Sequence, residues 1–434
     1  MEMTTTYVNS TRLTCTVEAG DTVMASAGGD PAYAPQSETL IVLVRNPSPG
    51  GGDSGSLDFI VHDNFTFTIP EVLSSSDHDA GYPQISVTFD GKIDVAWMEG
   101  WGDGNRIYMR HSGDSGVTWS PVRAVPGATS RSGGSPAICR DNDGTLHFAL
   151  NYGHAPNTVL RYFTFTDNGV TWSTGTNLYA WPAFGIELLA GAGKTLYLFA
   201  NIDGELHLMR STTNGSTWKV PVQISNNYAK PVHINAELDY QGNLFAIWTQ
   251  LEGQGPHDHR VWFSRSLDGG ASWLNQRILA SAFAQHFYSV GIAAAANQHL
   301  VAAWVKNFGY SSDYAAAFRF GNKLGDTWSA IKKIESQDTR SINPAISSDS
   351  AGNVHLFIQD GGIISKSLSL RQRFWRSTDS GSNWTKPVFI KNVHPVFHHD
   401  PDSGTDAEGH VYLVFVDYLG TDRRLYFTRS QIPD

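Results

Sequence analysis

Histidines, carboxylates, aromatic rings and a few cations gather in particular loops of the predicted strand pattern. Nine of the 16 histidines lie in loops that lead into the first strand of a predicted repeat or that join its second and third strands. In such a set, aromatic rings can cover the face of a sugar, carboxylates can bind its hydroxyl groups, and His or Tyr can transfer protons. The sequence therefore predicts a glycan site, with His233 as a candidate for proton transfer. The candidate substrate-binding residues are His78, Tyr82, Glu99, Trp101, Arg131, Lys230, His286, Arg340, His398 and His399.

Other histidines favour different interpretations. His257 and His259, in the segment GPHDHR, have a spacing that metal ligands can use, but their loop lacks the remaining ligands. We therefore expect no metal at the site and no cofactor, and we leave a structural calcium ion open. Four more histidines begin predicted second strands, and we interpret them as structural: His147, His299, His355 and His410.

The composition restricts the class of protein. The 434 residues include 12% aromatic residues, 42 Gly and 19 Pro, which is typical of many short strands joined by tight turns. This excludes a coiled coil and a collagen-like repeat. The net charge of -10 argues against nucleic acid as the main partner, because phosphate binding needs a clustered basic field. Two cysteines exclude a disulfide framework, no apolar run predicts a membrane span, and we expect a monomer.

Regularly spaced tryptophans reveal an internal repeat. Six of them, each three residues after a glycine, follow one another at intervals of 53, 46, 55, 55 and 56 residues: Trp119, Trp172, Trp218, Trp273, Trp328 and Trp384. Each repeat predicts four short antiparallel strands, and such a sheet buries both faces only when the repeats pack face to face in a closed ring. Residues 64–434 are therefore predicted to form an all-β, seven-bladed β-propeller, with six blades as the alternative. The strand in residues 64–75 would complete the seventh blade and close the ring.

The hairpins that precede these tryptophans carry a known motif. SGDSGVTW (112–119), SLDGGASW (266–273) and STDSGSNW (377–384) resemble the Asp-box, or BNR repeat, S-x-D-x-G-x-x-W of the sialidase superfamily. TDNGVTW, TTNGSTW and KLGDTW are partial versions of it. In this motif the Asp caps the turn, the Gly adopts a positive φ and the Trp packs between blades. The resemblance implies a fold, and the reaction must be argued from the site.

The first 63 residues differ from the repeats. TTTYVNSTRLTCTVEAGD and ETLIVLVRNPSPGGGDSGSLDFIV resemble the later strands of the IPT/TIG immunoglobulin-like domain, and the strands that usually precede them are absent. We expect residues 1–63 to form a partial β-sandwich that is less stable than the ring, because one edge is open. The resemblance implies a spacer at bacterial surfaces or in secreted proteins. We therefore expect an extracellular or cell-surface protein, although the chain shows no signal peptide.

The resemblance to sialidases also implies residue roles. Asp103, in the loop GWGDGN, lies roughly where the family places its acid/base Asp. The Y-S segment at Tyr288 resembles that of the nucleophilic Tyr, and the E-L segment at Glu237, or that at Glu187, resembles the one that holds the partner of this Tyr. The segment Gly-Tyr-Pro at Tyr82 replaces the Arg-Ile-Pro of the family, so one arginine of the carboxylate clamp is missing.

Two further functions remain open beside an exo-sialidase-type hydrolase. The segment SPAICRDNDGTLHFALNYGHAPNTVLRY resembles a pattern of seven-bladed polysaccharide lyases, which act on uronate polysaccharides by His/Tyr β-elimination. His154 occupies the second histidine of that pattern, and Ser132 to Ser135 replace the first. A non-catalytic propeller that binds glycans or proteins is the other alternative. The sequence thus predicts a sialidase-like propeller that recognises glycans at the mouth of its channel, and it leaves open whether the protein is an enzyme.

Overall fold

The chain separates into two compact units. A computed structural model describes residues 4–9, 12–16, 38–42, 57–61, 65–75, 78–100, 106–129, 136–152, 159–166, 171–180, 183–226, 231–251, 259–274, 276–282, 287–295, 298–307, 314–333, 340–364, 367–385, 387–390, 401–419 and 422–431. One unit comprises Met1–Thr66 and Gln431–Asp434, and the other comprises Phe67–Ser430.

The described part of the first unit contains two antiparallel strand pairs. β1 (Thr4–Asn9) pairs with β2 (Arg12–Thr16), and β3 (Glu38–Val42) pairs with β4 (Leu57–Val61). β-Branched and apolar residues predominate in these strands, as their β propensity requires. The IPT/TIG character of residues 1–63 stays a prediction.

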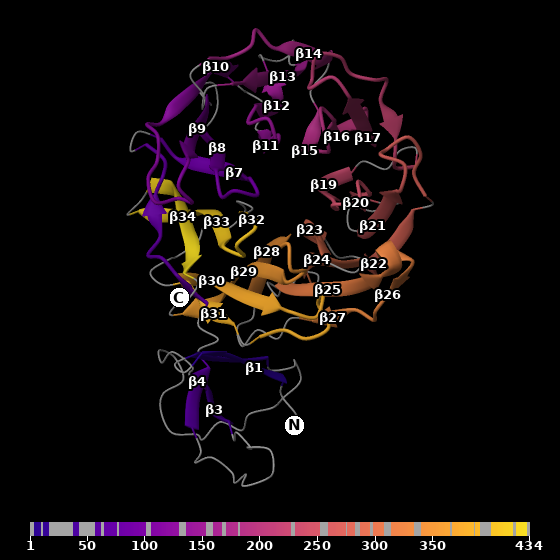
Figure 1. Ribbon diagram of the computed structural model, residues 1–434. Coiled ribbons are helices and arrows are strands. Elements are labelled where there is room, and N and C mark those ends of the chain that lie inside the picture. Colours follow the sequence, from indigo (N-terminus) through magenta and orange to yellow (C-terminus); the bar gives the residue numbers. More distant parts are fainter. Residues whose placement is uncertain are drawn as a thin grey trace. The chain divides into compact units, whose positions relative to one another are not determined.

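The second unit is a ring of seven blades whose strands pair antiparallel within each blade, so the seven-bladed prediction is confirmed and the six-bladed alternative is wrong (Figure 1). Each blade has its first strand innermost, toward the ring axis (Figure 1). The strands of blades 1 to 4 are β7 (Ala80–Val87), β8 (Ile93–Glu99), β9 (Arg106–Ser112), β10 (Arg123–Thr129); β11 (Ala137–Arg140), β12 (Leu146–Tyr152), β13 (Val159–Phe165), β14 (Thr176–Tyr179); β15 (Phe184–Ala190), β16 (Leu196–Ile202), β17 (Glu205–Ser211), β18 (Val222–Gln223); and β19 (Pro231–Leu238), β20 (Leu244–Leu251), β21 (His259–Ser266), β22 (Arg277–Ala282).

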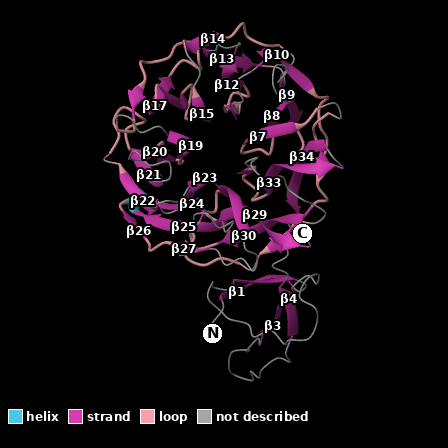
Figure 2. Cartoon of the chain, turned by 180° about the vertical axis from the view of Figure 1, so that it is seen from behind, coloured by secondary structure: helices cyan, strands magenta, loops and turns pink. Residues whose placement is uncertain are grey.

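Blades 5 and 6 share one continuous sheet, because β25 and β28 form a parallel bridge between Tyr314 and Arg340. The remaining strands are β23 (Phe287–Ala295), β24 (His299–Asn307), β25 (Tyr314–Asn322), β26 (Thr327–Trp328), β27 (Lys332–Lys333); β28 (Arg340–Ser348), β29 (Val354–Ile364), β30 (Ser367–Ser377), β31 (Val388–Phe389); and β32 (Asp402–Thr405), β33 (Val411–Leu419), β34 (Asp422–Gln431). Figure 2 shows strands and loops almost throughout. Within the described segments, no helix has the length and apolar character that crossing a membrane requires.

The seventh blade takes its outer strand from the segment that precedes the first blade. β6 (Glu71–Val72) pairs antiparallel with β34 through Tyr426 and Phe427. β5 (Thr66–Phe67) also joins this sheet, and the Leu73 N–H donates to the Leu425 carbonyl at 2.8 Å. The two ends of the repeat region thus share one sheet, which leaves no free edge where the ring closes.

The motif hairpins have the geometry expected from the sequence. Asp114 accepts hydrogen bonds from the Thr118 N–H at 2.9 Å and from the Ser112 hydroxyl at 2.8 Å, and Gly116 has a φ of 78°. Hydrogen bonds from Thr118 lower the pKa of Asp114 to about 2. Five motif tryptophans contact an aromatic ring of the preceding blade, in the pairs Trp119–Phe427, Trp218–Tyr162, Trp273–Phe199, Trp328–Phe263 and Trp384–Phe318. Trp172 departs from this rule, since its ring lies against Phe148 and Phe163 of its own blade.

Candidate functional site

Five of the seven innermost strands are interrupted at the same level. β7, β15, β19, β23 and β28 each show a register shift against the second strand of their blade, close to the end at which the chain enters the inner strand. The other two inner strands, β11 and β32, have four residues each and continuous registers. Bulges bend a strand and change the direction of its side chains, and they are common beside active sites. This end of the ring axis, named the entrance end below, is therefore the candidate site.

The bulges contain non-glycine residues with left-handed backbones. Tyr82, Ser289 and Asn343 have φ values of 51°, 43° and 51°, and the equivalent residue of β15 is Gly185 with 54°. A non-glycine residue in this region costs of order 1–3 kcal/mol, and such strain concentrates at functional sites. In β19 the bulge contains His233, whose N–H donates to Thr249 Oγ1 at 3.2 Å. We call these five residues the bulge ring.

Buried polar neighbours hold part of the bulge ring in place. The side-chain amide of Asn343 is buried and donates to Gln359 Oε1 at 3.0 Å, and Gln359 is itself fully buried. Tyr82 is half-buried and packs against the apolar cluster shared by blades 1 and 2. Since these groups are fixed by packing, the entrance end has a preformed shape rather than one that a ligand must create.

Three carboxyl groups lie deeper along the axis and form the second part of the site. Glu187 of β15, Glu237 of β19 and Asp402 of β32, named the axis carboxyls here, project from three different innermost strands and are all half-buried. Asp402 accepts hydrogen bonds from the N–H groups of Ile85 and Ser403, both at 2.9 Å. It therefore also satisfies a backbone N–H on the neighbouring inner strand, β7.

Asn235 performs the same task between blades 4 and 5. Its side-chain oxygen accepts a hydrogen bond from the N–H of Ile292 at 2.9 Å. It also hydrogen-bonds to Glu187 of blade 3. Glu237 differs from these residues, since no hydrogen bond or ion pair joins its carboxyl to any described residue.

The surroundings of Glu187 and Glu237 favour their neutral forms. Burial raises the pKa of Glu237 to about 8, and the negative charges of Asp239 and Asp402 add to the increase. Burial also raises the pKa of Glu187 well above its ordinary value, together with the charges of Asp402 and Glu237, while a hydrogen bond from Asn235 opposes the shift. Both side chains keep some solvent contact inside the ring. With a pKa of about 8, Glu237 retains its proton at neutral pH, as a general acid requires.

Glu99, a predicted substrate-binding residue, is occupied within the protein. It is 1% exposed. Its carboxylate accepts hydrogen bonds from the Trp97 indole at 2.8 Å, from the Ser75 N–H at 2.9 Å and from the Ser75 hydroxyl at 2.6 Å. Glu99 therefore holds the segment that leads from the closing strand into blade 1, and we do not include it among the proposed glycan contacts.

Arginines of blade 7 fix the loop that leads into β7. The Arg423 guanidinium donates to Asp79 at 2.9 Å, and the Arg424 guanidinium donates to the His78 carbonyl at 3.1 Å. Burial alone would raise the pKa of Asp79, but hydrogen bonds and charge from Arg423 lower it overall. His78, a predicted binding residue, is exposed on this fixed loop. Neither arginine was predicted from the sequence, because both lie at the start of the third strand, β34, and not in a loop.

The remaining predicted residues divide into two groups. For two of them the structure describes the backbone: Tyr288 lies near the start of β23, opposite Val305, and Arg340 begins β28, opposite Gly361. The others lie outside the described residues: Asp103, Trp101, Arg131, His154, Lys230, His286, His398 and His399. Their roles stay predictions.

Three of the four histidines that begin second strands make hydrogen-bond contacts within their own blades. His147 contacts the Tyr162 hydroxyl at 2.7 Å and Asp141 at 3.0 Å, His355 contacts Asp349 at 3.1 Å, and His410 contacts Asp406 at 3.0 Å. These three connect the turn after the first strand to the second strand, which is the structural role expected of them. His259 lies in β21, while its predicted neighbour His257 is outside the described residues. Within the described segments, no group of three or more His, Cys, Asp or Glu side chains is arranged to hold a metal ion.

Comparisons with known proteins agree with this architecture. No family model matches the chain. The chain is 25% identical over 243 residues to an exo-alpha-sialidase of Aspergillus fumigatus, a match that covers 49% of this chain and 53% of that protein. This chain thus spans about half the length of the curated relative that it matches.

Solved structures with low sequence identity share the fold. A protein of unknown function from Dyadobacter fermentans superposes with a TM-score of 0.56 at 15% identity, over 86% of this chain and all of that one. An alpha-L-arabinofuranosidase of Fusarium graminearum has a TM-score of 0.50 at 12% identity, over 84% and 97% of the two chains. An alpha-L-arabinanase of Penicillium chrysogenum has a TM-score of 0.50 at 12% identity, over 84% and 98%. The fold is therefore a β-propeller architecture that also occurs in enzymes acting on glycans.

Proposed function

We propose that the ring binds a glycan at its entrance end and cleaves a glycosidic bond with the axis carboxyls. The observation that carries this proposal is the carboxyl of Glu237, which has no partner among the described residues and whose pKa is raised to about 8. Glycosidases use two carboxyl groups in different protonation states, and burial is a common way to keep one of them protonated. Glu237 supplies the protonated carboxyl, and Asp402 supplies a carboxylate held by two backbone N–H groups.

The chemistry follows from these two states. Glu237 donates its proton to the glycosidic oxygen as the bond from that oxygen to the anomeric carbon breaks. Water adds to the anomeric carbon, and its proton passes to Asp402. The products are two sugars with free hydroxyl groups, and one proton has moved from Glu237 to Asp402. The bulge ring holds the sugar at the entrance, where His233 and Tyr82 offer polar and aromatic contacts.

The similarity to an exo-alpha-sialidase supports an activity on glycans, and the shared fold with an alpha-L-arabinanase is compatible with it. A sialidase-type reaction would also need cations for the substrate carboxylate, and the predicted cations Arg131 and Lys230 lie outside the described residues. The lyase alternative depends on His154, which also lies outside the described residues. Secretion and a monomeric state complete the proposal. Culture fractionation and light scattering test these two points.

The decisive experiment incubates the protein with sialosides, uronate polysaccharides and neutral oligosaccharides. New reducing ends report hydrolysis, and ultraviolet absorbance of unsaturated uronates reports elimination. We expect hydrolysis of at least one glycan. Glu237→Gln, which imitates the neutral acid in shape but cannot donate its proton in the same way, should lower kcat about 100-fold or more.

The matched control is Glu408→Gln, since the Glu408 side chain is 80% exposed in a turn of blade 7 and should leave the rate unchanged. A full rate in Glu237→Gln would remove this carboxyl from the mechanism. Binding on glycan arrays without turnover would instead establish the non-catalytic alternative. Unsaturated products would establish the lyase.

A further inference from the structure

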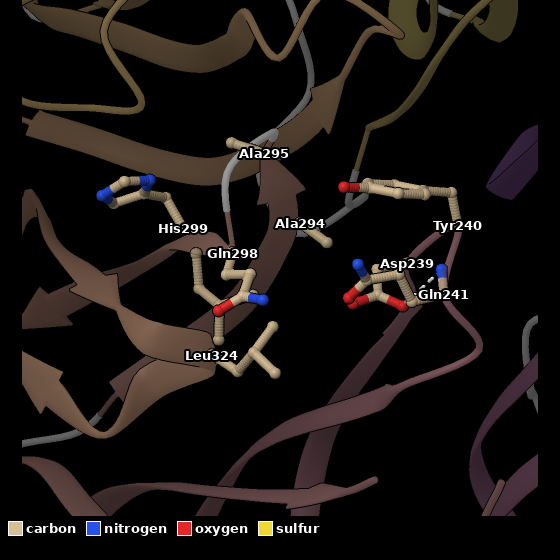
Figure 3. Close-up of a pocket in the computed structure, with 9 residues that line it drawn as sticks. Asp239, Tyr240, Gln241, Ala294, Ala295, Gln298, His299 and Leu324 are labelled. Atoms are coloured by element: carbon tan, nitrogen blue, oxygen red, sulfur yellow. Dashed lines mark hydrogen bonds between the residues drawn. The ribbon is translucent and has the colours of Figure 1, made fainter.

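A shallow groove lies between blades 4 and 5 at the opposite end of these blades from the bulge ring. One side comes from the turn between β19 and β20, and the other comes from the end of β23, the start of β24 and the short 3-10 turn Lys323–Gly325 that follows β25 (Figure 3). Because β19 and β23 begin at the entrance end, the turns that follow them lie at the far end. The groove therefore lies at the other end of the ring axis from the bulge ring, and its rim residue Asp239 is two residues from Glu237. Its lining residues are Asp239, Tyr240, Gln241, Ala294, Ala295, Gln298, His299, Leu300 and Leu324.

The first side of the groove presents an aromatic ring on a rigid turn. Tyr240 is 81% exposed, which is unusual for a large aromatic side chain. Asp239 holds the turn, accepting hydrogen bonds from the Gln241 N–H at 2.9 Å, the Asn243 N–H at 2.8 Å and the Asn243 amide at 2.7 Å. The ring thus stands in solvent on a backbone that is already ordered, so binding a ligand on it costs little conformational entropy.

The opposite side has a strained and well-anchored backbone. Gln298, Lys323 and Leu324 have φ values of 63°, 49° and 59°. The Leu324 N–H donates to the Gln298 carbonyl at 2.8 Å, and Arg265 donates to the Lys323 carbonyl at 2.8 Å. The exposed side-chain amide of Gln298 makes no hydrogen bond to any described residue. Strained non-glycine residues cluster at ligand clamps more often than elsewhere, and this amide offers both a donor and an acceptor.

We propose that this groove is a second, non-catalytic binding site for an uncharged sugar unit of a polysaccharide. The Tyr240 ring stacks on the apolar face of the sugar, and the amides of Gln241 and Gln298 bind its hydroxyl groups from the two sides. The Asp239 carboxylate at the rim disfavours an anionic sugar. The proposal does not depend on the proposed hydrolysis, because none of these residues belongs to the bulge ring or to the axis carboxyls.

The test is affinity electrophoresis of the full chain in gels that contain arabinan, xyloglucan or glucomannan, all of which are neutral polysaccharides. The wild-type protein should be retarded in at least one gel, and Tyr240→Ala should weaken this binding about tenfold, since one ring face is lost. Tyr240→Phe should keep most of the retardation. Phe89→Ala is the matched control, because Phe89 occupies the same position in the turn of blade 1, is 75% exposed and lines no part of this groove.

The outcomes separate this site from the active site. Loss of retardation in Tyr240→Ala, with wild-type behaviour in Phe89→Ala, supports the groove. Equal retardation of Tyr240→Ala and wild type overturns it, and so does an absence of wild-type retardation in all three gels. Loss in Tyr82→Ala alone would overturn the groove and assign the binding to the entrance end.

Discussion

Replacing Glu237 with Gln should make the second unit more stable than wild type at alkaline pH, by an amount that changes with pH in a defined way. In the unfolded chain Glu237 titrates near 4.5, and in the folded protein its pKa is about 8. The folded state therefore holds the proton more tightly. The stabilising contribution of Glu237 to wild type is fully present below pH 4.5. It decreases as the pH rises from 4.5 to about 8, and it does not change further above that range.

The size of the effect follows from the same pKa values. A difference of about 3.5 units at about 1.36 kcal/mol per unit gives about 5 kcal/mol, and partial solvent contact of the carboxyl reduces this to about 2–5 kcal/mol. Gln cannot titrate. The stability of Glu237→Gln relative to wild type should therefore increase by this amount between about pH 5 and about pH 9.

Urea unfolding followed by tryptophan fluorescence measures this difference, because all 13 tryptophans lie in the second unit. Glu408→Gln serves as the exposed control and should show no such trend, since its side chain is 80% exposed. A difference between Glu237→Gln and wild type that is the same at both pH values would refute the reasoning. Such a result would mean that the pKa of Glu237 is not raised in the folded protein, because water would reach its carboxyl as freely as in the unfolded chain.

Two further predictions concern the scaffold. Asp349 and Asp239 cap equivalent turns, but only Asp349 also contacts a buried histidine, His355, at 3.1 Å, and hydrogen bonds from His355 and Asn353 hold its pKa at about 2 against the opposing effect of burial. Asp349→Asn should thus lower the free energy of unfolding by about 2 kcal/mol more than Asp239→Asn does at neutral pH. This difference between the two variants should disappear as the pH falls from 3.8 to about 2. Equal losses in urea unfolding at neutral pH would contradict the role of His355. Gly116→Ala should lower the thermal midpoint far more than Gly144→Ala, because both glycines have a positive φ but only the new methyl group at 116 would collide with Phe427. Similar thermal midpoints for the two variants would contradict this reasoning, because they would mean that Phe427 can move aside at little cost in stability.

The repeat architecture could be predicted from the sequence because its signals are local. The Asp, Gly and Trp of a motif hairpin lie within a few residues of one another, as Asp114, Gly116 and Trp119 do, so their hydrogen bonds and turn conformation follow from short segments. Even here one tertiary effect was hidden. Trp172 packs against the apolar cluster shared by blades 1 and 2, but its aromatic contacts, with Phe148 and Phe163, lie within its own blade.

The candidate site was predictable only in part. Sequence similarity drew attention to Glu237, but Asp402 and Asn343 carry no motif. Glu99 was assigned to the substrate because it follows a strand, whereas the structure shows its carboxylate bound to Trp97 and to Ser75. A side chain that satisfies internal donors and one that awaits a ligand look identical in a sequence, since the difference lies in which groups from other segments reach it.

The sequence by itself determined the period of the repeat, the hairpin chemistry and the number of blades, because each of these depends on neighbours along the chain. The tertiary structure alone decided where the inner strands bulge, that Glu187, Glu237 and Asp402 share one axis, and that the pKa values of Glu187 and Glu237 are raised. Those properties arise from burial and from charges on other blades. Desolvation and electrostatic interaction act through space, so they exist only once the ring has closed.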